Sequence, residues 1–122
     1  MFKRYKLADI PIERKWKGVV KEVKFYYETT AIDVDYYDYC IDMINTLENC
    51  IQISIKYKRM DEKNYRQEYG ILYLLSDGVI HGQDANGFID GRIMESENKK
   101  IMEIYYRSKT DNLSFSGELE LK

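Results

Sequence analysis

The fold is decided by the stretch GILYLLSDGVIHGQDANGFIDGRIM, which covers residues 70–94. It contains two dipeptides, Asp77-Gly78 and Asn86-Gly87, that are strong signals for two-residue hairpin turns. Around these turns, apolar and polar residues alternate as they do in strands with one buried face. The stretch therefore predicts three short antiparallel strands joined by two tight turns.

Two-residue turns also fix which residues lie opposite each other in the sheet. The first turn would pair Tyr73 with Gly82, and the second would pair Gly82 with Gly91. Paired residues share a face, and the face that results is mostly apolar. It consists of Ile71, Tyr73, Leu75, Ile80, Gly82, Ile89, Gly91 and Ile93. Glycines on this inner face, with Gly117 at the same parity in the last strand, favour a sheet that bends sharply or closes.

Strand-type alternation continues on both sides of this stretch. It is found at Ile51, Ile53, Ile55 and Tyr57, at Met102, Ile104 and Tyr106, and at Leu113, Phe115, Leu119 and Leu121. Near the N-terminus, Val19, Val23, Phe25 and Tyr27 share one parity, which Lys21 interrupts. We expect a mainly β protein, an antiparallel meander of about seven or eight strands coiled or closed into a small barrel.

Residues 33–48 show a different period. Apolar side chains recur there at helical spacing, at Ile32, Tyr36, Cys40, Met43, Ile44 and Leu47. This stripe predicts one helix near 33–48. A strand at 39–45 followed by a turn is the alternative, because Tyr39, Ile41 and Met43 also alternate with their neighbours.

Length and composition indicate one soluble domain spanning residues 1–122. No apolar run approaches the roughly 20 residues that cross a bilayer, and the first residues lack the apolar core of a signal peptide. We therefore expect a cytoplasmic protein without a membrane partner. Cys40 and Cys50 are interpreted as buried, reduced thiols, and whether they ever pair is left open.

The sequence offers little for catalysis. It has one His, no Gly-rich phosphate loop, no nucleophile elbow and no recognisable pair of catalytic carboxylates. We expect no metal or cofactor, and an enzyme is the less favoured class. The formal net charge of −2 makes nucleic acid an unlikely partner.

Three segments together resemble a known group of proteins. They are Trp16-Lys17-Gly18, the run from Asp77 to Gly91 with its two turns, and the ending Phe115-Ser116-Gly117. Together they resemble the small calycin-type barrels, the lipocalin and avidin-like up-and-down group, chiefly over residues 70–122. The resemblance implies a barrel around a core or a small cavity, without specifying a ligand.

The walls of such a cavity would be aromatic. The candidates are Trp16, at the start of the first strand, and the tyrosines at inner parity, Tyr27, Tyr57, Tyr73 and Tyr106. Such residues more often simply fill a barrel of this size, each hydroxyl finding a backbone partner. Our first hypothesis is a non-catalytic barrel that binds a small apolar or aromatic molecule.

The acidic segment supplies the alternative hypothesis. Residues 28–50 hold six Asp or Glu and no Lys or Arg. On the expected helix, Asp35, Asp38 and Asp42 would share one face with Tyr39 beside them. This face could dock a basic partner, as an immunity or inhibitor protein of a mobile element would, although a merely solvated helix face is the simpler interpretation. The oligomeric state is left open.

Overall fold

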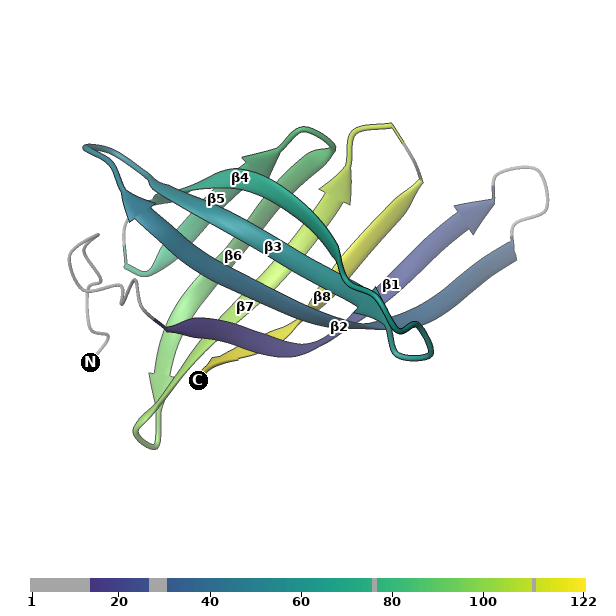
Figure 1. Ribbon diagram of the computed structural model, residues 1–122, viewed down its shortest axis with the longest axis horizontal. Helices are drawn as coiled ribbons and strands as arrows, with labels where there is room; N and C mark the ends of the chain where they lie inside the picture. The colour runs from purple at the N-terminus through teal and green to yellow at the C-terminus, as the bar shows by residue number, and fades with distance from the viewer. Residues whose placement is uncertain (1–13, 27–30, 76, 111) are drawn as a thin grey trace.

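The computed structural model describes residues 14–26, 31–75, 77–110 and 112–122. These residues form eight strands: β1 Lys15–Tyr26, β2 Ala31–Thr46, β3 Ile51–Arg59, β4 Arg66–Leu74, β5 Val79–Asp84, β6 Gly87–Ser96, β7 Lys99–Ser108 and β8 Leu113–Leu121. Each strand pairs antiparallel with the next, and β8 pairs with β1, so the sheet closes into a barrel (Figure 1). The prediction of a mainly β antiparallel barrel is confirmed. This barrel is compatible with the calycin-type fold.

The helix expected near 33–48 is wrong, because this region is the long strand β2. β2 pairs with β1 over residues 31–42 and with β3 over residues 37–46. The alternating residues Tyr37, Tyr39, Ile41 and Met43 are buried, whereas four of the six residues in the helical stripe are exposed. The alternative of a strand at 39–45 followed by a turn is the correct one, with Leu47 N donating to Cys50 O at 2.8 Å.

The predicted inner face of β4 is also wrong, by one residue. Leu75 N donates to Val79 O at 2.7 Å, so the loop between these residues has three residues rather than two. Tyr73 therefore pairs with His81 instead of Gly82. A one-residue shift moves every side chain of a strand to the other face, so Leu72 rather than Tyr73 lies in the core.

The inner faces of β5 and β6 are as predicted, although their pairing differs. Ile80 pairs with Gly91 and Gly82 with Ile89, which is a shift of two residues and keeps each side chain on its face. The expected pair of Gly82 with Gly91 is therefore wrong. Gly91 has a steric role, because a Cβ there would overlap the backbone oxygen of Glu103 on β7. The two strands approach too closely for a larger residue, as a sharply coiled sheet requires.

In β1 the buried parity is the opposite of the one that the valines suggested. Trp16, Val20 and Glu22 are buried, whereas Val19 and Phe25 are about half exposed. The apolar residues of this series do not mark the core face. Phe25, for example, pairs with Ile32 of β2, and both side chains are exposed to solvent.

The barrel interior divides into two ends. We call the closed end the part near Trp16, where Ile41 and Leu121 pair with that tryptophan on either side. It and the middle of the barrel are filled by buried aliphatic side chains, among them Ile53 and Met102. We call the opposite end, where β1 ends and β2 begins, the open end. Among the described residues, no helix is long and apolar enough to span a bilayer.

Candidate ligand-binding site

A pocket of about 290 Å³ lies inside the open end of the barrel. Its wall is mainly aromatic and is formed by Tyr37, Tyr39, Tyr57, Tyr106 and Phe115. These rings come from inward positions of β2, β3, β7 and β8 near the open end, whereas most inward positions further along these strands carry aliphatic chains. Alternation along each strand aims all of these rings inward.

Phe115 lies at the centre of this aromatic wall. Its ring centroid is 5.2 Å from that of Tyr37, in an edge-on arrangement, and 5.6 Å from that of Tyr106. Tyr39 and Tyr57 lie 6.4 and 6.3 Å from it. These separations fall in the range in which aromatic pairs attract each other. The rings therefore hold one another in place and leave a preformed wall.

Asp84, which is 7% exposed, supports the pocket from the end of β5, where the turn to β6 begins. Its Oδ1 accepts hydrogen bonds from the backbone N–H groups of Asn86 and Gly87, both at 2.8 Å. The Tyr106 hydroxyl donates to the same oxygen at 3.2 Å. Gly87 makes this contact sterically feasible, because a Cβ there would lie only 2.6 Å from the Tyr106 hydroxyl. The turn carboxylate thus fixes the position of a pocket tyrosine.

Glu68 lies beside Asp84 and lines the pocket directly. Its Oε1 accepts from the Tyr57 hydroxyl at 3.1 Å and from Asn86 Nδ2 at 2.9 Å. Asp84 Oδ2 is buried and accepts no hydrogen bond from the permanent donors of the described residues. The neighbouring Glu68 carboxyl can donate a hydrogen bond to the Asp84 carboxylate when it carries a proton. Burial, and then this bond to Asp84, raise the pKa of Glu68.

A third carboxyl, Glu22, lines the pocket from β1 and is 7% exposed. Burial raises the pKa of Glu22, and a hydrogen bond with Tyr37 partly offsets that effect. Burial likewise raises the pKa of Tyr37 and of Tyr57 to about 12. The pKa values of Tyr39 and Tyr106 are raised for the same reason. The pocket tyrosines are therefore neutral hydroxyl groups at neutral pH.

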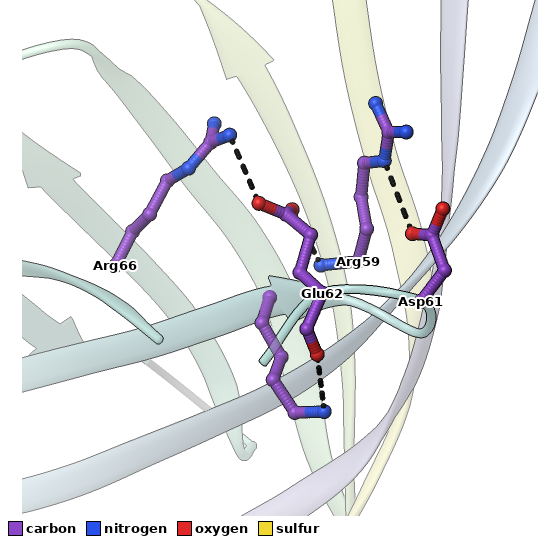
Figure 2. Close-up of polar contacts among 5 residues, drawn as sticks. Arg59, Asp61, Glu62 and Arg66 are labelled. Atoms are coloured by element: carbon purple, nitrogen blue, oxygen red, sulfur yellow. Dashed lines mark hydrogen bonds and ion pairs between the residues drawn. The ribbon is translucent and has the colours of Figure 1, made fainter. Parts of the chain in front are cut away.

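The cationic side chains at the rim are engaged by the loop between β3 and β4. Figure 2 shows Arg66 reaching toward Glu62, with Nη2 3.5 Å from Oε2, and Arg59 reaching toward Asp61, with Nε 3.4 Å from Oδ1. Lys58 Nζ donates to the Glu62 backbone oxygen at 3.1 Å. Arg66 lines the pocket, but its charge is partly balanced by Glu62, which lies outside the pocket.

The structure brings together only some of the residues singled out for a cavity. Tyr57 and Tyr106 line the pocket. Trp16 is 1% exposed and belongs to the core at the closed end. Tyr73 lies on the outer face beside His81, and Tyr27 lies outside the described residues.

The acidic face expected on a helix is divided between two sides of β2. Tyr39 is 3% exposed inside the barrel, and Asp35 shares its inward parity near the open end. Asp38 and Asp42 are at outward parity. Asp38 accepts a hydrogen bond from the Tyr65 hydroxyl, and Asp42 Oδ2 lies 3.9 Å from Lys15 Nζ.

Sequence reasoning missed most of the polar side of the pocket, including Glu22, Glu68 and Asp84, and the rings of Tyr37 and Phe115. The sequence carried no signal for the two glutamates, because the inner faces expected for β1 and β4 place both of them outward, and only the observed parity of these strands turns them inward. Charged residues on a core face are costly unless they have a task or a partner.

The described residues contain no group of three or more His, Cys, Asp or Glu that could hold a metal ion. Cys40 and Cys50 are both free thiols and partly buried. No family model, curated protein or solved structure matches this chain.

Proposed function

We propose that the protein is a non-catalytic binding protein that holds a small organic molecule in the open end of its barrel. The observation that carries this proposal is the contrast between the 290 Å³ pocket and the filled closed end. A barrel that needed only a core would continue its aliphatic packing to both ends. The pocket volume is near the lower limit of about 300 Å³ for small-molecule sites, which suits a ligand of about one ring.

The character of the wall supports the same proposal. Five aromatic rings offer apolar contact surface, and the tyrosine hydroxyls with the carboxyl groups of Glu22 and Glu68 offer directional contacts. Ligand sites commonly combine these two elements. The resemblance to calycin-type barrels, many of which enclose ligands, points in the same direction. A cytoplasmic location remains a prediction from the sequence.

The test compares the mass of the freshly purified full chain under native conditions with its mass after denaturation. We expect an extra mass of roughly one small molecule that is lost on denaturation, since pockets bury most of a ligand's surface. Tyr106→Ala should lose the extra mass. The matched control Tyr105→Ala, on the exposed neighbouring position of β7, should retain it. Equal behaviour of the two variants would contradict the proposal.

A second candidate function is an interaction with a basic protein partner. It is supported by the outward parity of Asp38 and Asp42 beside exposed apolar side chains of the same strand, Ile32, Val34 and Tyr36. Apolar patches with polar borders are common in protein interfaces. The double variant Asp38→Lys, Asp42→Lys should abolish capture of such a partner, and unchanged capture would exclude this surface.

A further inference from the structure

We propose that the ligand of the pocket is an organic cation, a small molecule that carries an ammonium group next to an apolar or aromatic part. This inference rests on the proposed function and specifies the chemistry of the ligand. Three features of the open end support it. They are the charged side chains that line the pocket, the aromatic rings of its wall, and the neighbouring carboxyl groups of Glu68 and Asp84.

The charge of the pocket favours a cation. Two carboxyl groups line it, those of Glu22 and Glu68, and Asp84 lies directly behind Glu68. The cationic side chain in the lining is Arg66, which is exposed and lies 3.5 Å from Glu62 outside the pocket. Lys24 and Arg59 also act on Glu22 from outside the lining, and Arg59 is itself paired with Asp61. A ligand carboxylate would enter a site with an excess of negative groups, whereas an ammonium group would balance them.

The aromatic wall is suited to the same ligand. The faces of aromatic rings carry partial negative charge and attract cations within about 6 Å of the ring centre. Tyr37, Tyr57 and Phe115 contribute rings from three different strands, β2, β3 and β8. An ammonium group in the pocket would therefore lie close to aromatic rings of three different strands.

The carboxyl pair supplies the acceptor that an ammonium group needs. Asp84 is more than nine-tenths buried and its Oδ2 lacks a permanent donor. Glu68 can serve it only while protonated. An ammonium group that donates to Glu68 would favour the ionised form of Glu68, whose proton would pass to solvent. The groups that face Glu68 are Tyr57 from β3, Asp84 from β5 and Asn86 from the following turn, together with the hydroxyls of Tyr39 from β2 and Tyr106 from β7.

This arrangement predicts that amine affinity rises with pH as Glu68 loses its proton. The sign follows from charge, since the ionised carboxylate attracts an ammonium group and the neutral carboxyl does not. Tyr57 remains neutral throughout that range because its pKa is raised to about 12.

The experiment is a calorimetric titration of the full chain with three probes that share a phenyl ring and a short side chain. They are phenethylamine, phenethyl alcohol and phenylacetate, which carry a positive, a neutral and a negative group. We expect the amine to bind at least about tenfold more tightly than the alcohol, and the acid to bind most weakly.

The variant Glu68→Gln keeps the size of the side chain and removes its charge. It should abolish the preference for the amine and its pH dependence, while leaving the affinity for phenethyl alcohol within about twofold. Glu103→Gln is the matched control, because Glu103 lies exposed on the outer face of β7. It should behave like the unchanged protein.

The outcomes separate the two proposals. Equal affinity for amine and alcohol, or tighter binding of the acid, overturns the inference of a cation and leaves the binding function intact. If no probe binds, the chemistry of the molecule released in the native mass experiment tests whether the ligand is a cation. A released amine supports the inference and a released neutral or acidic molecule overturns it. The absence of any released molecule, with no probe binding, overturns both proposals.

Discussion

At both ends of the barrel, side chains alternate between inward and outward positions along each strand, but the inward residues differ in kind. At the closed end, inward positions carry Trp16, Ile41 and Leu121, which are buried and packed on one another. At the open end, inward positions carry tyrosines and the carboxyl groups of Glu22 and Glu68, around a pocket. The alternation along a strand therefore determines which side chains point inward. The chemistry of those side chains determines whether they pack as a core or line a pocket.

The comparison also separates the end that we expect to stabilise the fold from the end that we propose binds a ligand. Burial of aliphatic groups stabilises the closed end, whereas buried carboxyls at the open end cost free energy unless they are paired. Proteins commonly accept such a cost at functional sites. We therefore expect core variants at the closed end to change stability strongly and pocket variants to change it less.

The largest effect is expected for Trp16→Ala. Removal of this buried ring should lower the free energy of unfolding by about 3–5 kcal/mol, the usual cost of a large cavity. Urea or thermal unfolding measures the change. Trp16→Phe is the milder control, because it retains a ring and removes an indole N–H that lacks a partner. A loss below that of the pocket variants would refute the assignment of stability to the closed end.

Tyr106→Phe tests the open end with a smaller change. It removes the hydroxyl that donates to Asp84 at 3.2 Å, a bond to a carboxylate that contributes about 2 kcal/mol. Tyr105→Phe changes the exposed neighbour on the same strand and should stay within about 0.5 kcal/mol of the unchanged protein. Equal unfolding midpoints for the two variants would contradict the role of the Tyr106 hydroxyl.

Glu68→Gln should be stabilising by about 1 kcal/mol at neutral pH, because an amide can donate to the Asp84 carboxylate permanently, whereas the carboxyl donates only while it is protonated. The pKa of Glu68 is raised in the folded protein. A raised acid pKa stabilises the folded state below the ordinary value and loses this effect as pH rises through the raised one. The gain of the variant should therefore shrink on acidification. A gain that is constant with pH would contradict this explanation.

The smallest effect is expected for Tyr73→Ala on ligand binding. Tyr73 lies on the outer face beside His81, so its removal should leave probe affinity within about twofold. Tyr57→Ala, which removes a ring of the pocket wall, is the contrasting variant. Reduced affinity in Tyr73→Ala alone would contradict the position of Tyr73 on the outer face, which follows from its pairing with His81.

The sequence predicted the inward face of a strand correctly where its apolar residues alternated without a competing helical pattern. The inward series of β3, from Ile51 to Tyr57, and those of β7 and β8 are confirmed. The faces of β5 and β6 are confirmed as well, because a shift of two residues leaves parity unchanged. Closure of the barrel adds the pairing of β8 with β1, which no local pattern encodes.

The errors have two physical causes. In β2, exposed apolar residues such as Ile32 and Ile44 coincided with helical spacing, and only pairing with β1 and β3 selects the strand. In β4, a loop with one more residue than the dipeptide signal implied reversed the faces and removed Tyr73 from the interior. The candidate site depended on both regions, so only Tyr57 and Tyr106 were found for the pocket.

The placement of the single tryptophan has a spectroscopic consequence. Trp16 lies at the closed end, and the tyrosines that line the pocket lie at the other. Indole fluorescence should therefore report unfolding of the core, with blue-shifted emission in the folded state and little response to a bound molecule. Tyrosine emission should report occupancy of the pocket. One protein without any label thus carries two separate optical signals, one for each end of its barrel.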